Sequence, residues 1–166
     1  MEITVQSSGH LTWNARQVRC ALGRGGISSD KVEGDGVTPA GNFPLRRVHY
    51  RADRMSAPQT KLTTRAIEAD DGWCDEPADP AYNKLIKRPL AASHEELWRA
   101  DHVYDVIVEL GHNDEPPVPG LGSAIFMHVV RPGFEPTEGC VALKMEDLLD
   151  LLADCDEATV IAIAAE

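Results

Sequence analysis

Short segments with alternating apolar and polar residues, or with brief apolar runs, are the feature that most limits how this chain can fold. Strict alternation buries one face of a segment and exposes the other, which is typical of β-strands. Helices of ordinary length need longer patterns with a different period. The segments lie at residues 2–6, 11–13, 16–22, 43–50, 104–110, 124–130 and 158–164. The sequence therefore predicts a mainly β domain of six or more short strands.

Helical features are confined to two short regions. Residues 144–153 place leucines at helical spacing and carry acidic residues near their start, where the helix dipole favours negative charge. Residues 93–96 read Ser-His-Glu-Glu, which has the Ser-x-x-Glu form of a capping box. We therefore expect a helix over residues 144–153 and a short helix over residues 93–100.

Two long segments between the predicted strands are rich in turn-forming residues. Residues 23–45 are dense in glycine, aspartate and proline, with turn dipeptides at Asp35-Gly36 and Thr38-Pro39. Residues 70–90 carry three prolines and five acidic residues. We expect residues 70–90 to be a surface excursion without regular structure, and long loops of this kind often carry function.

Length and charge limit the classes of protein to consider. A chain of 166 residues is expected to form a single domain over residues 1–166. The net charge of −11 disfavours nucleic acid and anionic membrane surfaces as partners, because both bind basic protein surfaces. The apolar runs are too short to span a bilayer, so no transmembrane segment is predicted. These features leave the oligomeric state unknown.

The start of the chain and its cysteines bear on the cellular compartment. Residues 1–18 contain no basic segment followed by an apolar one, so no signal peptide is predicted and the expected location is cytoplasmic. A periplasmic location is the alternative, if the sequence is trimmed or exported by another route. The four cysteines form no Cys-x-x-Cys pair and are expected to be reduced thiols.

One cysteine and one histidine lie in a pattern suited to catalysis. His128 lies in the apolar run at residues 124–130, and Cys140 follows Gly139 twelve residues later. A cysteine attacks carbonyl groups as a thiolate, and a nearby histidine can take its proton. Residues 141–143 are expected to lead into the helix, so backbone N–H groups near Cys140 are candidate oxyanion donors. From the residues alone, two buried packing residues or a zinc site with His112 and Asp114 remain alternatives.

Three sequence motifs resemble the L,D-transpeptidase catalytic domain, the YkuD-type family. They are DGVTPAGNFPL at residues 35–45, GSAIFMHVV at residues 122–130 and PTEGCVAL at residues 136–143. Similarity extends over residues 18–143. It departs from the family pattern at Glu138, where histidine is common, and at Leu143, where arginine or asparagine is common. Both departures concern contacts to substrate.

The resemblance implies an L,D-transpeptidase-like β-sandwich with long active-site loops and a cysteine that forms a thioester with peptidoglycan stem peptides. Cys140 corresponds to the nucleophile and His128 to its base. The N–H groups of Gly139 and Cys140 are the implied oxyanion donors. No metal and no cofactor are implied. The bond attacked joins the L-centre of a diamino acid to a terminal D-alanine.

Four further residues are candidates for binding substrate. Arg131, between His128 and Cys140, is suited to a substrate carboxylate or is an ordinary surface arginine. His112 either contacts substrate or lies in a plain turn, and Thr137 belongs to the Thr-x-Gly-Cys turn. Tyr82 lies in residues 70–90, which either cover the pocket or are anchored to the body by their aromatic residues.

Three functions follow as hypotheses. The first is transfer of the acyl group from the Cys140 thioester to an amine, which cross-links or exchanges stem peptides. The second is an L,D-carboxypeptidase that passes the acyl group to water and trims recycled muropeptides in the cytoplasm. The third is a catalytically silent module that binds peptidoglycan peptides, although such a binder has no use for the paired histidine and cysteine.

Overall fold

Strand β6 (Gly41–Tyr50) organises the fold because its two halves pair with different neighbours. In this computed structural model, which describes residues 1–165, the first half of β6 pairs with β14 (Val160–Ala164). The second half pairs with β11 (Val106–Leu110) on one side and with β7 (Thr63–Ala66) on the other. One long strand thus joins two groups of strands into a single large sheet.

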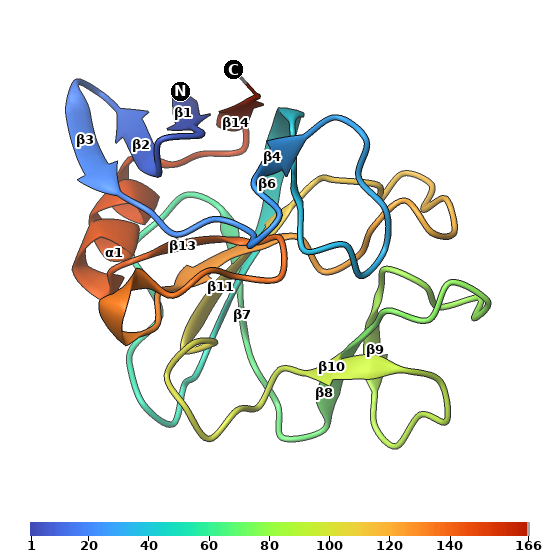
Figure 1. The fold of residues 1–166 in the computed structure, drawn as a ribbon. Coiled ribbons are helices and arrows are strands. Elements are labelled where there is room, and N and C mark those ends of the chain that lie inside the picture. The colour runs from blue at the N-terminus through green and yellow to red at the C-terminus, as the bar shows by residue number, and fades with distance from the viewer. Residues whose placement is uncertain (166) are drawn as a thin grey trace.

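The large sheet continues outward from β6 in both directions. Beyond β14 lie β1 (Glu2–Gln6), β2 (His10–Trp13) and β3 (Arg16–Arg19), and beyond β11 lie β12 (Phe126–Val129) and β13 (Val141–Leu143). The pairs β1–β14, β12–β13 and β6–β7 are parallel, and the other neighbours are antiparallel. Both chain ends lie side by side at the top of Figure 1, as the pairing of β1 with β14 requires.

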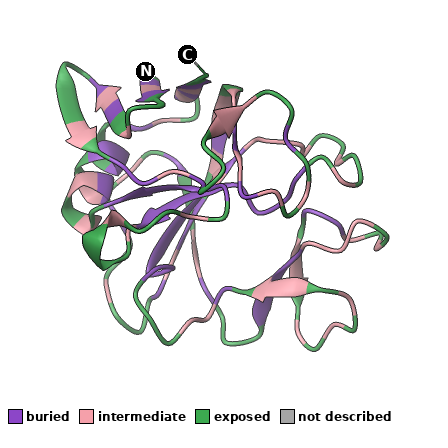
Figure 2. Ribbon diagram, viewed as in Figure 1, coloured by how far each residue is buried: buried purple, intermediate pink, exposed green. Residues whose placement is uncertain are grey.

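One apolar core is shared by both halves of the large sheet. Ile3 and Ile161 from one half and Val108 and Met127 from the other belong to the same buried cluster. Helix α1 (Met145–Asp154) packs on this cluster through its fully buried leucines, Leu148, Leu151 and Leu152. Figure 2 shows the central strands as mostly buried and the connecting loops as mostly exposed. The mainly β, sandwich-like fold predicted from the sequence is confirmed.

Each predicted strand segment contains a strand, with ends that differ by a few residues. The helix predicted over residues 144–153 is α1. A single 3-10 turn, η1 (Pro132–Phe134), follows β12. A two-stranded parallel sheet of β4 (Ile27–Ser28) and β5 (Thr38–Pro39) shapes the glycine-rich segment between β3 and β6.

The prediction that residues 70–90 lack regular structure is wrong. They contain β8 (Asp71–Cys74) and β9 (Leu85–Lys87), which form a second, three-stranded sheet with β10 (His94–Glu96) in the lower right of Figure 1. All four residues of β8 are buried. The Trp73 ring packs edge to face against the Phe126 ring, with the ring centroids 5.0 Å apart. The irregular part is only the proline-rich turn between β8 and β9.

The short helix predicted over residues 93–100 is also wrong, because His94–Glu96 forms strand β10. Glu95 pairs with Trp73 in the antiparallel pairing of β8 and β10. The backbone N–H and C=O groups of this segment therefore form hydrogen bonds between strands and not within a helix. A capping-box sequence is a local preference, and pairing with a buried neighbouring strand overrides it.

Among residues 1–165, no helix has the length and apolar character needed to cross a membrane.

Candidate active site

The parallel pairing of β12 and β13 brings Cys140 to the start of β12. Met127 is opposite Val141, so Cys140, just before β13, lies beside Phe126. The Phe126 N–H donates a hydrogen bond to Cys140 Sγ at 3.4 Å, and the thiol donates to the carbonyl oxygen of Ala124 at 3.2 Å. Cys140 is buried, with 7% of the residue exposed, and it lines the cavity described below.

The turn before Cys140 is held by Thr137. Its hydroxyl donates to the carbonyl oxygen of Cys140 at 2.7 Å and accepts the Gly139 N–H at 3.1 Å. The Gly139 N–H, expected from the family resemblance to face an oxyanion, is therefore engaged within the turn in this structure. Gly139 has φ +135°, and a Cβ there would lie 2.8 Å from the carbonyl oxygen of Val37, so only glycine fits without rearrangement.

The upstream DGVTPAG motif lies against this turn. The Gly23 N–H donates to the Thr38 hydroxyl at 2.8 Å, and the Arg24 N–H donates to the Thr137 carbonyl at 2.9 Å. Thr137 in turn donates its N–H to the carbonyl of Leu22 at 2.9 Å. Two motifs about a hundred residues apart in the sequence therefore form one support for Cys140.

His128 projects from the middle of β12 on the same face as Phe126, because side chains alternate along a strand. Its Nδ1 lies 2.9 Å from the carbonyl oxygen of Val129. A carbonyl only accepts, so Nδ1 carries the proton and Nε2 has a free lone pair. The Tyr104 ring packs edge-on against the imidazole, with ring centroids 5.4 Å apart. A backbone carbonyl thus orients His128, and among residues 1–165 no acidic side chain hydrogen-bonds to its ring.

Burial keeps both groups uncharged. It raises the pKa of the Cys140 thiol to about 12, and the negative charge of Glu95 adds to the rise. Burial lowers the pKa of His128 to about 4, although its hydrogen bond to Val129 acts in the opposite direction. At neutral pH the pair is therefore a thiol and a neutral imidazole, and the thiol proton is directed at Ala124.

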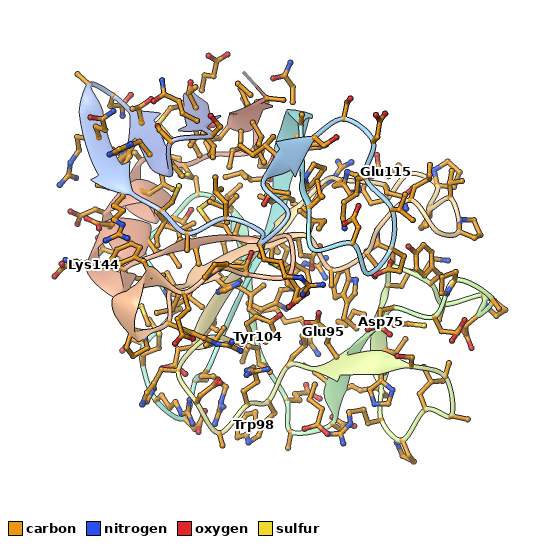
Figure 3. All side chains as sticks on the ribbon, viewed as in Figure 1. Asp75, Glu95, Trp98, Tyr104, Glu115 and Lys144 are labelled. Atoms are coloured by element: carbon orange, nitrogen blue, oxygen red, sulfur yellow. The ribbon has the colours of Figure 1, made fainter. Side chains whose placement is uncertain are left out.

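Cys140 and His128 both line a cavity of about 440 Å³. The cavity lies between the large sheet, the loop at residues 31–34 and strand β10, and Figure 3 shows Glu95 and Tyr104 where these elements meet. Two of the predicted substrate-binding residues, Arg131 and Thr137, also line it. Arg131 is exposed and has no ion-pair partner among residues 1–165, so its guanidinium is available to a ligand.

The other two predicted substrate-binding residues, His112 and Tyr82, do not line this cavity. The His112 Nε2 hydrogen-bonds to the carbonyl oxygen of Leu121 at 2.9 Å, and its ring packs edge-on against Phe43. The Tyr82 hydroxyl donates to Glu33 and accepts the Gly122 N–H. Both side chains are used to hold loops together.

The four possible zinc ligands suggested by the sequence are not brought together. Cys140 and His128 share the cavity, whereas His112 supports the loop near Leu121 and Asp114 forms an ion pair with Arg46. The group of described residues with metal-like spacing lies elsewhere, at Glu68, Asp70 and Asp71. Lys87 forms ion pairs with all three of these carboxylates.

Several cavity residues were not foreseen from the sequence. Lys31 and Glu33 come from the loop after β4, Asp75 and Glu95 from the small sheet, and Tyr104 from the segment before β11. Of these residues, only Asp75 lies in the segment 70–90, where the density of acidic residues was a signal. That signal carries no information on which carboxylates face inward.

With this geometry established, comparison with known families gives a clear result. The sequence pattern of the YkuD family, the L,D-transpeptidase catalytic domain, matches residues 3–163. The match covers nearly the whole chain, so the protein belongs to the L,D-transpeptidase catalytic domain family. Its members are acyltransferases that act on the peptide stems of peptidoglycan.

The other comparisons add little. No curated protein sequence matches the chain. Two solved structures of the helical cell shape determining protein Pgp2 from Campylobacter jejuni, one of them a lysine-to-alanine mutant, are similar to it with TM-scores of 0.47 and 0.48. They share 12% and 10% identity and cover 99% of this chain, which spans 47% of theirs.

Proposed function

We propose that the protein is a cysteine acyltransferase that opens the bond between the diamino acid and the terminal D-alanine of a peptidoglycan tetrapeptide stem. The observation that carries this proposal is the location of Cys140 and His128 on one cavity wall, with the histidine Nε2 free to accept a proton. Membership of the family supplies the substrate class.

The proposed reaction uses both groups. His128 Nε2 takes the thiol proton as Cys140 Sγ attacks the carbonyl carbon, and the resulting oxyanion is stabilised by the backbone N–H of Cys140, because the N–H of Gly139 is engaged by Thr137. The tetrahedral intermediate then breaks its C–N bond, and the imidazolium returns the proton to the departing amine of D-alanine. The tripeptide acyl group remains on Cys140 as a thioester.

The second half of the reaction depends on the acceptor. We propose an amine from a second peptide as the principal acceptor, which makes the protein a transpeptidase. Water in its place makes the protein an L,D-carboxypeptidase, and a cytoplasmic location favours this second function because small recycled muropeptides are the substrates found there. Cell fractionation tests the location.

The experiment incubates the purified protein with a disaccharide tetrapeptide ending in D-alanine, with and without an added D-amino acid, and identifies products by mass spectrometry. An exchanged or cross-linked product that the Cys140→Ala protein does not form supports the transpeptidase. Tripeptide alone, again absent with Cys140→Ala, supports the carboxypeptidase. No product in either condition refutes both and leaves the silent binding module.

A further inference from the structure

The cavity around Cys140 contains more acidic than basic groups. Six carboxylates and three basic side chains line it. Two of the carboxylates, Glu96 and Glu138, form ion pairs with Arg88 and Arg24. Three other carboxylates, Glu33, Asp75 and Glu95, are partly buried. None of the three forms an ion pair with a residue in the range 1–165. Arg99 lines the same cavity and its charge acts on Glu95 without forming an ion pair, so the negative charge of these three groups is only partly balanced.

The three carboxylates come from different elements and have only neutral partners. Glu95, on β10, accepts the Tyr104 hydroxyl at 2.5 Å, and Glu33 accepts the hydroxyl of Tyr82. Asp75 directly follows β8, and its Oδ1 is buried without any hydrogen-bond partner. In Figure 3, Glu95 and Asp75 are neighbours in the space between the large sheet and β10. A buried carboxylate oxygen without a donor is suited to accept a hydrogen bond from a ligand.

We propose that Glu33, Asp75 and Glu95 form a subsite that binds a primary ammonium group of the substrate, namely the side-chain amine of the diamino acid in the stem peptide. This inference rests on the proposed function, because it assigns one part of the same substrate to one wall of the same cavity. A primary ammonium has three N–H donors, so it can hydrogen-bond to two carboxylates of the subsite while the charge of the third acts on it at longer range.

The three carboxylates do not converge on one point as the ligands of a metal ion do. Among the described residues, the carboxylates that converge closely enough for one ion are Glu68, Asp70 and Asp71, outside the cavity. Glu33, Asp75 and Glu95 lie farther apart, yet close enough for the charges of Asp75 and Glu33 to act on Glu95. A divalent ion needs several oxygen atoms at about 2.0–2.6 Å, which a spread group does not offer.

The subsite also has a consequence for the nucleophile. The negative charge of Glu95 adds to the rise that burial causes in the pKa of Cys140. A bound ammonium would offset this charge, so thiolate formation becomes easier when the correct substrate is in place. The exposed Arg131 lines the same cavity and is available to a substrate carboxylate. An ammonium site and a carboxylate site together fix the direction in which the peptide lies.

The test measures binding to the Cys140→Ala protein by titration calorimetry, so that affinity is read without turnover. Two tetrapeptides ending in D-alanine are compared, one with L-lysine at the third position and the other with that lysine acetylated on its side-chain nitrogen. We expect the acetylated peptide to bind about tenfold more weakly or worse, because a charged hydrogen-bonded group is lost. Equal affinities, or no binding of either peptide, would overturn the proposal.

Comparing the binding of the free-amine and acetylated peptides in carboxylate variants of the protein locates the subsite. Asp75→Asn and Glu95→Gln remove a charge at nearly constant shape, and together they are expected to reduce the preference for the free amine to about twofold or less. Glu76→Gln, next to Asp75 but outside the cavity, is the matched control and should keep the full preference. An unchanged preference in the double variant would place the ammonium elsewhere and refute the assignment.

Turnover by the unsubstituted protein separates this inference from the proposed function. Cleavage of both peptides with equal KM would refute the ammonium subsite and leave the acyltransferase in place. Selective binding of the free-amine peptide without any D-alanine release would support the subsite and refute the proposed reaction.

Discussion

Cys140 and His128 are both held uncharged by burial, with pKa values of about 12 and about 4. The histidine therefore has its acceptor lone pair ready, and the sulfur becomes a thiolate only as the proton leaves. Proton transfer in such a pair is coupled to the arrival of the substrate carbonyl. This state of the site leads to two predictions at the scale of single residues.

The first prediction concerns alkylation of Cys140 by iodoacetamide. Because only the thiolate reacts and the pKa of this thiol is about 12, we expect the rate to rise about tenfold per pH unit between pH 7 and pH 10. Peptide mass spectrometry resolves Cys140 from the other three cysteines. A rate that is already maximal at pH 6 would instead indicate a preformed thiolate–imidazolium pair.

The second prediction concerns stability at low pH. The unfolded imidazole has its ordinary pKa near 6.5, whereas folded His128 titrates near 4. As the pH falls from 6.5 to 4, the unfolded state takes up a proton that the folded state does not, so folding loses about 3 kcal/mol from this group. Urea unfolding at several pH values should show this loss in the unsubstituted protein and not in His128→Gln. Equal losses in both proteins would contradict it.

At the residue scale, the sequence identified the Cys140 turn and the strand histidine because both belong to motifs with fixed spacing. Of the residues predicted to bind substrate, His112 and Tyr82 do not line the cavity. Whether a polar residue in a loop faces a ligand or holds another loop depends on its tertiary partners. The Tyr82 hydroxyl, for example, lies between Glu33 and Gly122, both distant in the sequence.

At the scale of structural elements, the turn at residues 137–140 and the small sheet both fix the position of the thiol. The turn is held by hydrogen bonds from Thr137 and by contact with the loop that contains Val37. The small sheet acts through Asn83, which lies between β8 and β9. Its Oδ1 accepts both the Trp73 indole N–H and the Ala124 N–H.

The third prediction tests the turn. Gly139→Ala places a Cβ 2.8 Å from the carbonyl of Val37 at φ +135°, so we expect it to cost about 2–4 kcal/mol of folding free energy and to abolish most acyl transfer. Gly120→Ala is the matched control, because Gly120 also has positive φ but no atom within 4 Å of the added Cβ. It should cost about 1–2 kcal/mol and leave activity intact. Equal effects of the two substitutions, measured by denaturant unfolding and product assay, would refute this account.

The fourth prediction tests the link between the small sheet and the thiol. Asn83→Ala leaves the Trp73 and Ala124 N–H groups without partners, which we expect to cost about 2–4 kcal/mol. Ala124, at φ +52°, also loses the contact that holds its carbonyl toward Cys140, so alkylation of the thiol should become faster. Asn14→Ala, at another positive-φ but exposed position, is the control and should leave alkylation unchanged. Slow alkylation in a folded Asn83→Ala protein would contradict the link.

The large sheet was predictable from sequence because its strands have regular apolar patterns, whereas the small sheet was not. Strand β8 reads Asp-Gly-Trp-Cys, four residues without alternation, and β10 carries a capping-box sequence that favours a helix. Strand β8 pairs with both β9 and β10, and its Trp73 packs on Phe126, so these strands are stabilised by pairing and tertiary packing. Contacts of this kind form between segments that are distant in the sequence, so the pattern of residues within one segment does not predict them.

At the scale of the whole molecule, the chain belongs to the L,D-transpeptidase catalytic domain family, and its large sheet carries the proposed nucleophile and base while its small sheet borders the same cavity. The large sheet contributes His128 from β12 and Cys140 from the turn before β13. Strand β10 of the small sheet contributes Glu95, and the segment directly after β8 contributes Asp75. Both carboxylates line the cavity. In the proposed reaction, rigid strands therefore position the nucleophile and the base, and the small sheet positions the carboxylates proposed to bind the substrate.

The most direct test of the central claim is to trap the thioester. The protein is mixed with tetrapeptide, quenched in acid within milliseconds to seconds, and measured as intact protein and as proteolytic peptides by mass spectrometry. The account predicts an added tripeptide acyl mass on the peptide that contains Cys140, weaker accumulation in His128→Ala and none in Cys140→Ala. Release of D-alanine by the Cys140→Ala protein, or an acyl group on any other residue, would contradict it.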